Sequence, residues 1–170
     1  MTAIKTLIET PIKTIAAALV LATSLPALAA DEAPVKDISV TTELSAVTNE
    51  AAAAYWASLD TDLKTAIATR VADRIGDTGA VITIDIEEVS LSNGFTEKLG
   101  LADTRIVGDI MVQDDDDVRR NQYYTLTIDV NRATPMMPEG TDVATLPADT
   151  RVYYTAMVDA FAENVVENLR

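Results

Sequence analysis

The chain has 170 residues, with 27 acidic and 13 basic side chains, a net charge of −14, and neither histidine nor cysteine. The missing residue types exclude a histidine general base, a cysteine nucleophile, a disulfide, and any zinc, iron–sulfur or haem site that needs His or Cys ligands. The acidity argues against nucleic acid and anionic lipid as partners, because both bind through basic patches.

The first thirty residues are typical of a cleavable bacterial secretory signal. Lys5 and Lys13 give a weakly positive leader, and an apolar stretch follows over 14–25. This stretch is shorter than the roughly 20 residues of a membrane-spanning helix, and it ends in small residues. We therefore expect cleavage near Ala29 or Ala30 and a periplasmic or secreted protein. An uncleaved N-terminal anchor is the alternative.

Residues 31–170 are expected to form a single α+β domain, because no linker rich in Pro, Gly or Ser divides them. Four segments alternate apolar and polar residues with the period of two that indicates strands with one buried face. They cover 37–44, 80–92, 105–113 and 123–131. The second segment changes phase near Glu87 and Glu88, which predicts a β-bulge there. Such regular alternation favours an antiparallel sheet that is covered on one face.

Two segments have the helical period instead. The first covers about 49–75, with apolar residues every four positions. Asp60 is a point at which it divides, and Gly76 and Gly79 are expected to end it. The second covers about 149–169, and its apolar stripe favours core packing over a ligand groove; the stripe comprises Tyr154, Met157, Phe161, Val165 and Leu169. The predicted order is β-α-β-β-β-α, a single antiparallel four-stranded sheet with two helices on one face.

Four consecutive carboxylates lie between the third and fourth predicted strands, at Asp114, Asp115, Asp116 and Asp117. Carboxylate oxygens are the ligands that Ca²⁺ and Mg²⁺ take. The spacing differs from the EF-hand loop, which alternates its ligands over twelve residues and turns on a glycine. A Ca²⁺-stabilised turn at these residues is one prediction. The other is a solvated hairpin tip, whose charge deters edge-to-edge aggregation.

A second group of carboxylates, Asp85, Asp109 and Asp129, is expected on the uncovered face of the sheet. Clustered carboxylates shift one another's pKa values and can act as an acid–base pair, so a carboxylate-based hydrolase is one hypothesis. Ordinary polar sheet surface is the other. The chain has no G-x-S-x-G, S-x-x-K, P-loop or dinucleotide-binding glycine pattern. We therefore expect that it is not an enzyme.

A secretory signal followed by this order of elements resembles the small α/β domains of Gram-negative envelope proteins, such as the lipopolysaccharide-assembly or transport auxiliary lipoproteins. The resemblance covers most of residues 31–170 and is seen in the sequences at 55–56, 88–91 and 105–109. It implies a non-catalytic binding or assembly-accessory protein with a protein partner in the envelope. The chain lacks the cysteine that anchors lipoproteins. In the long loop over 133–148, Met136 and Met137 are candidates for partner contact.

Overall fold

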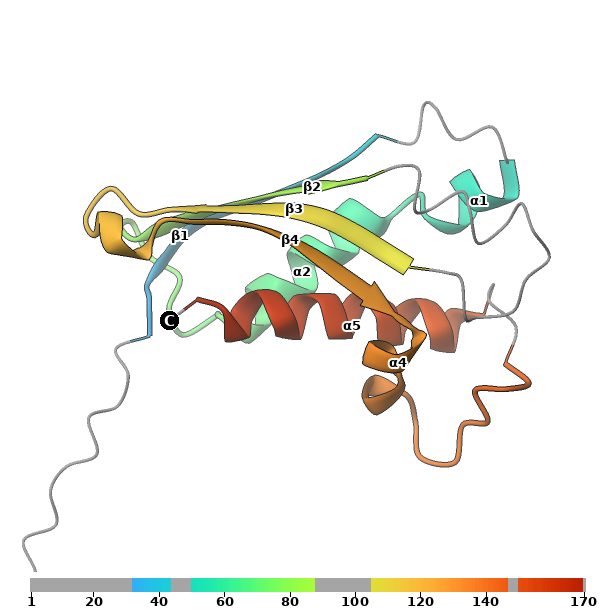
Figure 1. The fold of residues 1–170 in the computed structure, drawn as a ribbon. Helices are drawn as coiled ribbons and strands as arrows, with labels where there is room; N and C mark the ends of the chain where they lie inside the picture. Colours follow the sequence, from blue (N-terminus) through green and yellow to red (C-terminus); the bar gives the residue numbers. More distant parts are fainter. Residues whose placement is uncertain (1–31, 44–49, 88–104, 147–149, 170) are drawn as a thin grey trace, which may run out of the picture.

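The computed structural model describes residues 32–43, 50–87, 105–146 and 150–169. Four neighbouring strands form one sheet, with helices packed beneath it (Figure 1). In spatial order the strands are β1 (Val35–Thr42), β2 (Ala80–Ile86), β3 (Arg105–Gln113) and β4 (Gln122–Asp129). The helices are α1 (Glu50–Tyr55), α2 (Leu59–Arg70), α4 (Val130–Ala133) and α5 (Arg151–Glu167), with short 3-10 turns η2 (Val118–Arg120) and η3 (Thr134–Met136).

The α+β class is confirmed, but the expectation of a purely antiparallel sheet is wrong. Strands β1 and β2 are parallel, whereas β2 with β3 and β3 with β4 are antiparallel. The expected element order also changes, since α1 and α2 both lie between β1 and β2, and α4 lies between β4 and α5. A helical crossover returns the chain to the end at which β1 began, so the next strand must be parallel to it. The alternation of apolar and polar residues indicates only that one face of the sheet is covered. It does not distinguish parallel from antiparallel neighbours.

The buried faces of the strands agree with the sequence pattern. Alternate residues of β2 and β3 lie in the core, namely Ile82, Ile84, Ile86, Ile106, Gly108, Ile110 and Val112. The fourth predicted strand extends too far, because β4 ends at Asp129 and the buried Val130 begins α4. The Asp129 carboxylate accepts a hydrogen bond from the Arg132 backbone N–H at 3.1 Å and caps that helix. The predicted bulge includes Glu87 and Glu88, and Glu88 lies outside the described residues.

The first predicted helix is two helices, and it ends early. The chain turns at 56–58, before Asp60, and α2 ends at Arg70 rather than at the glycines. The turn lies where the Trp56 indole is fully buried, with its ring 4.7 Å from that of Tyr55 in an edge-to-face arrangement. Beyond α2, Ile75 is 50% exposed and forms an isolated parallel bridge with Val35. Ile75, the last apolar residue of the first predicted helix, is therefore not in the core.

Helix α5 packs under β4 and the neighbouring β3. The core stripe predicted over 149–169 is confirmed, since all five of its residues are buried. Gly108 makes this approach possible. A Cβ there would lie 2.8 Å from Ile86 Cδ1 and 3.1 Å from Phe161 Cζ. Arg70 joins α2 to α5 through ion pairs with Asp159 at 3.0 Å and Glu163 at 3.1 Å.

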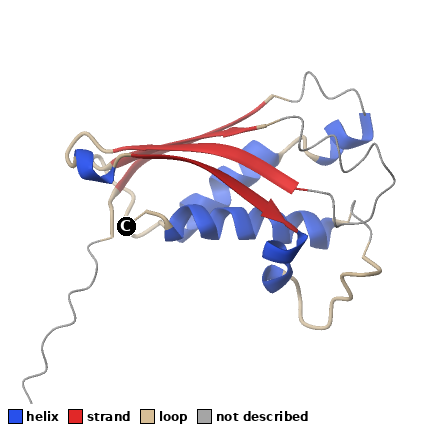
Figure 2. Ribbon diagram, viewed as in Figure 1, coloured by secondary structure: helices blue, strands red, loops and turns tan. Residues whose placement is uncertain are grey.

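The sheet is consequently part of a two-layer structure, with α2 and α5 on one side (Figure 2). Within the described part of the chain, no helix covers the opposite face. That face carries the polar half of each strand, and it meets the helical layer at the outer edge of β1.

Candidate binding groove at the sheet edge

Strand β1 is an edge strand whose outer side is occupied only at its start. The Val35 N–H donates to the Arg74 carbonyl at 2.9 Å, and the Gly76 N–H donates to the Val35 carbonyl at 3.0 Å. After a register shift at Lys36, β1 pairs regularly with β2 from Asp37 to Thr42. Among the residues that the structure describes, no strand pairs with this part of β1 on its other side. An unpaired edge exposes backbone donors and acceptors that can bind another strand.

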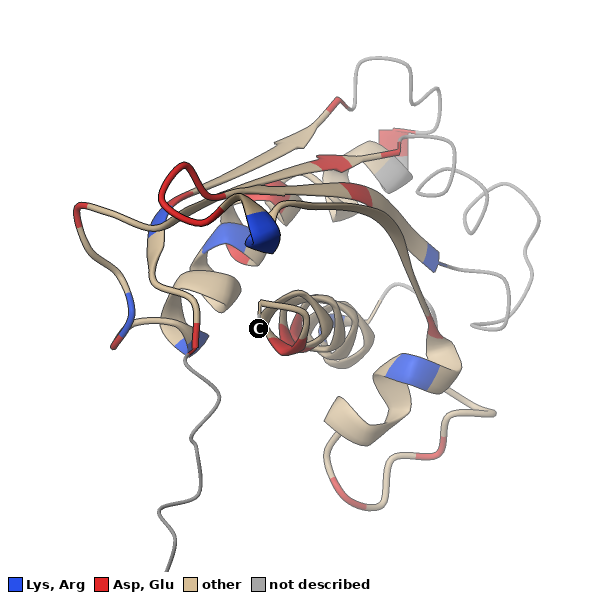
Figure 3. Ribbon diagram, turned by 60° about the vertical axis from the view of Figure 1, so that its left-hand side comes forward, with Lys and Arg blue, Asp and Glu red and all other residues tan. Residues whose placement is uncertain are grey.

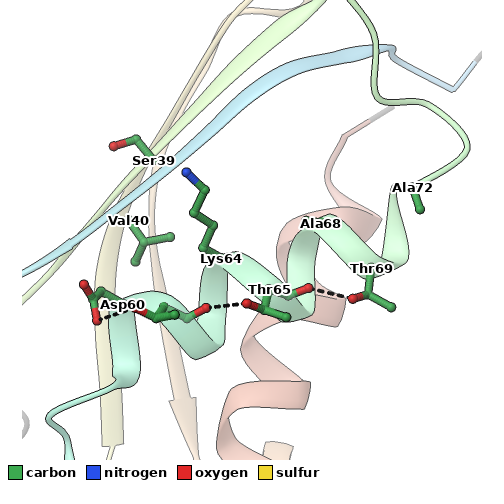
Figure 4. Close-up of a pocket in the computed structure, with 9 residues that line it drawn as sticks. Ser39, Val40, Asp60, Lys64, Thr65, Ala68, Thr69 and Ala72 are labelled. Atoms are coloured by element: carbon green, nitrogen blue, oxygen red, sulfur yellow. Dashed lines mark hydrogen bonds between the residues drawn. The ribbon is translucent and has the colours of Figure 1, made fainter.

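A groove of about 740 Å³ lies between this edge and helix α2 (Figure 4). Its walls come from two elements, because Ser39 and Val40 belong to β1 and most of the others belong to α2. The helical wall consists of Asp60, Thr61, Lys64, Thr65, Ala68, Thr69 and the following Ala72. These residues occupy the side of α2 away from the buried Leu59, Leu63 and Ile67. The groove is thus outside the core.

The helical wall is shallow and mainly apolar despite its threonines. The Thr65 hydroxyl donates to the Thr61 carbonyl at 2.7 Å, and the Thr69 hydroxyl donates to the Thr65 carbonyl at 2.8 Å (Figure 4). With the hydroxyls bonded to the helix itself, the threonine methyls and the neighbouring alanines remain for contact with a ligand. Lys64 extends from α2 toward β1 (Figure 4), and Asp60 lies one helical turn before it. Their opposite charges leave the groove close to neutral.

A smaller hollow of about 130 Å³ extends the groove to the beginning of β1. It shares Lys64 and Ala68 with the main groove and is otherwise lined by Val35, Lys36, Asp37, Ile38 and Ile75. The half-exposed Ile75 side chain therefore lies at the end where the edge of β1 is already paired. The two hollows together follow most of the length of the strand.

The acidic turn is drawn as a red loop in Figure 3. Its four carboxylates have different environments. Asp114 is 1% exposed, and its Oδ1 accepts from the backbone N–H groups of Asp116 at 2.9 Å and Asp117 at 3.1 Å. Arg120 donates to its other oxygen at 3.4 Å. Asp115 and Asp116 have exposed side chains. The one buried carboxylate thus closes the turn by binding the turn's own donors.

Asp117 is paired with the following η2 turn. It accepts from the Arg119 backbone N–H at 3.2 Å and from the Arg119 guanidinium at 2.8 Å. The hydrogen bond from the Arg119 side chain is the main reason that the pKa of Asp117 falls from 3.8 to about 2. Over the described residues, no group of three or more acidic side chains is arranged to hold a metal ion. Cation binding and the solvated hairpin tip both stay predictions.

The open-face carboxylates are only partly brought together. Asp85 and Asp109 lie directly opposite each other on β2 and β3. Asp129 instead faces Arg105, which is four residues, or about 13 Å, along β3 from Asp109. Glu43 joins the first two in a shallow hollow of about 240 Å³, whose other lining residues are Ile86 and Glu87. Figure 3 shows acidic residues in red on adjacent strands of the sheet.

Asp109 is held by two donors from β4. Its oxygens accept from the Thr125 hydroxyl at 2.6 Å and from the Tyr123 hydroxyl at 3.0 Å. The hydrogen bond to Asp109 raises the pKa of Tyr123, and the negative charges of Asp109 and Asp85 contribute, because a phenolate would be repelled there. The face is therefore a region of negative potential on which a cation would be favoured. The acid–base hypothesis for it stays untested.

Sequence reasoning missed the groove, although half of its signal is present in the sequence. Small residues recur on one side of α2 at 61, 65 and 68, and at 72 just beyond its end. This side is opposite the buried Leu59, Leu63 and Ile67. A helix side made mostly of small residues, with Asp60 and Lys64 as its charged members, is such a signal when it lies beside a strand. The other half is that β1 is an edge strand, which follows from strand order alone. Of the two methionines expected to meet a partner, Met137 packs against the core and Met136 is 36% exposed.

Comparison with protein-family models, curated proteins and solved structures finds no match to this chain. A functional assignment must therefore come from the groove and its surroundings. In the described ranges, no helix has the length and apolar character needed to cross a membrane.

Proposed function

We propose that this chain is an exported, non-catalytic binding or assembly-accessory protein of the bacterial envelope, which holds an extended segment of a partner protein at the edge of β1. The observation that carries the proposal is the outer edge of β1 from Asp37 to Thr42, which no strand of the described residues pairs with, and the groove of about 740 Å³ beside it. The secretory signal over the first thirty residues supports the location.

Binding of this kind is called β-augmentation. Backbone hydrogen bonds to the sheet edge supply much of the affinity, and pockets for alternate side chains supply specificity. The groove fits both requirements, because one wall is an edge strand and the other is the helix side formed by Thr65, Ala68 and Thr69. The pairing of Ile75 with Val35 supports the proposal further, since a backbone segment already bonds to the first residue of this edge.

Site-specific photo-crosslinking in cells tests this function. A photoreactive amino acid is placed at Ser39 or Thr69, which line the groove, and at Val118, which is 71% exposed on the acidic turn. We expect a discrete protein adduct from the two groove positions and none from Val118. Adducts from all three positions, or from none, would contradict the proposal. N-terminal sequencing of the protein from the periplasmic fraction, which should begin near Asp31, tests its export separately.

A further inference from the structure

The β1 edge lies between the groove beside α2 and the open face of the sheet, and the side chains on these two faces determine which segment the edge can bind. This inference rests on the proposed function and asks which side chains the bound segment carries. Neighbouring residues of an added strand point to opposite faces of the sheet. One set would therefore lie over α2 and the other over the open face.

The length of the site is fixed at its start by Ile75. Its bridge to Val35 occupies the first residue of the edge, and regular pairing of β1 with β2 continues from Asp37 to Thr42. A strand advances about 3.3 Å per residue, so this edge of about 20 Å fits an extended segment of about six residues.

Side chains on the groove side would meet small apolar groups. Val40 lies on the strand wall, and the helix contributes Ala68, Ala72 and the methyls of the threonines whose hydroxyls bond to the helix backbone. Asp60 and Lys64 offset each other there, so a charged side chain would lose hydration without gaining a partner. Aliphatic residues fit this side best.

Side chains on the open face would meet carboxylates. Glu43 and Asp37 are exposed at the two ends of the edge. One strand further in, Asp85 lies beside Thr41 and opposite Asp109, and Glu43 joins both in the hollow of about 240 Å³. Glu43 directly follows β1, and Asp85 is two strand spacings, or about 10 Å, from an added strand. Both carboxylates attract a basic side chain that extends over β1 and repel an acidic one. The net charge of −14 also attracts a basic segment over a longer range.

We propose that the free edge of β1 binds an extended segment of a partner protein in which aliphatic residues, packed against α2, alternate with Lys or Arg residues over the acidic open face. The segment completes a fifth strand of the sheet. Its basic side chains extend toward Glu43 and Asp85, and its aliphatic side chains cover Val40 and Ala68.

Binding of synthetic peptides to the full-length purified protein, measured by calorimetry, tests this inference. The probe is acetyl-Lys-Val-Lys-Val-Lys-Val-Lys-amide. Three peptides serve as controls: one with Glu in place of Lys, one with the same residues in two blocks of Lys and Val, and one with alternate backbone amides methylated. We expect the alternating Lys peptide to bind at least about tenfold more tightly than each control. The Glu peptide reverses the charge over the open face, the block peptide places Lys side chains in the apolar groove, and methylation removes backbone donors to the sheet edge.

Matched variants locate the binding. Thr65→Trp fills the groove and should abolish binding, whereas Thr155→Trp, at an exposed position of α5, should not change it. Glu43→Gln with Asp85→Asn should weaken binding by up to about tenfold, because both changes remove a charge that attracts the basic side chains. The control, Glu139→Gln with Asp142→Asn, removes the same two charges from the loop after η3 and should have little effect.

Equal binding of the alternating and block peptides would overturn the inference, because it would show attraction to the net charge alone. Failure of the alternating Lys peptide, together with binding of the Glu peptide that Thr65→Trp abolishes, would also overturn it. That second result would still agree with the proposed function, because a peptide would bind in the groove. If no peptide binds, the inference fails, and the crosslinking at Ser39 and Thr69 decides the proposed function independently.

Discussion

Ile75 lies beside Val35 in a parallel β-bridge that two backbone hydrogen bonds form, at 2.9 and 3.0 Å. This one-residue pairing covers the beginning of the β1 edge and leaves the Ile75 side chain 50% exposed beside the groove. Pairing between β1 and the segment that follows α2 is therefore confined to this one residue. In the part of the chain that the structure describes, the remaining length of the β1 edge, from Asp37 to Thr42, has no strand paired with it on the outer side.

Replacement of Gly76 by proline should destabilise the protein by about 1–3 kcal/mol. The change removes the N–H that donates to the Val35 carbonyl, and Val35 is fully buried, so the carbonyl would lose its partner. Gly76→Ala is the control, because no atom lies within 4 Å of an added Cβ. Urea unfolding of both variants provides the measurement. Equal stability of the two would contradict a structural role for the bridge.

Among the glycines that the structure describes, Gly79 should be the most sensitive to alanine substitution. Its φ angle is +113°, and a Cβ there would lie 2.4 Å from the Pro34 carbonyl oxygen, which is backbone and cannot move aside easily. Gly140 has a similar φ of +83° with open space around it. Gly140→Ala should therefore lose about 1–2 kcal/mol from backbone strain alone. Gly79→Ala should lose about 1–3 kcal/mol more from the collision, which thermal unfolding of both variants would measure.

Asp114→Ala should destabilise the protein by about 1–3 kcal/mol, because the backbone N–H groups of Asp116 and Asp117 lose a buried acceptor. Asp115→Ala changes an exposed carboxylate in the same turn and should stay within about 0.5 kcal/mol. The difference in unfolding free energy between the two variants measures the closing of the turn. Equal losses would show that the net charge of the turn matters more than its hydrogen bonds.

The same turn permits a direct test of cation binding. A Ca²⁺ site would raise the melting temperature with millimolar Ca²⁺ over EDTA, through binding to the folded state. Asp115→Asn combined with Asp116→Asn should abolish that response while leaving the Asp114 hydrogen bonds in place. An unchanged melting temperature in the original protein would favour the solvated hairpin tip instead.

The sequence predicted the elements of this fold better than their directions. The period of two in β2 and β3 identified the buried face correctly, because side chains of a strand alternate between faces whatever its neighbour does. It could not distinguish a parallel neighbour from an antiparallel one. The crossover through α1 and α2 decides this for β1, and a helical connection between consecutive strands was already present in the predicted order.

The candidate site was harder to predict than the core. The groove depends on the position of β1 at the edge and on the end of α2 at Arg70, and both are set by tertiary packing. Two predicted carboxylates, Asp85 and Asp109, do meet, because they occupy paired positions of one ladder. Asp129 does not join them, since it caps α4 and lies four residues further along the sheet from the pair.

Tyr154 links α5 to α2, and its hydroxyl donates to Asp62 at 2.7 Å. Burial is the main cause that raises the pKa of Tyr154 from 10.0 to about 12, and the hydrogen bond to Asp62 adds to it. Between pH 10 and pH 12 the unfolded chain therefore ionises this phenol while the folded protein keeps it neutral. Stability that is fully present below pH 10 is then lost as the pH rises through 12.

Replacement of Tyr154 by phenylalanine should consequently make the alkaline loss of stability less steep between pH 10 and pH 12. Ultraviolet titration of phenolate in the folded protein should also lose a component that ionises near pH 12. Asp62→Asn is the companion variant. It keeps an acceptor for the hydroxyl but removes a negative charge, so the pKa of Tyr154 should move down toward its ordinary value. A titration in which all tyrosines of the original protein ionise together near pH 10 would contradict the buried hydrogen bond between α2 and α5.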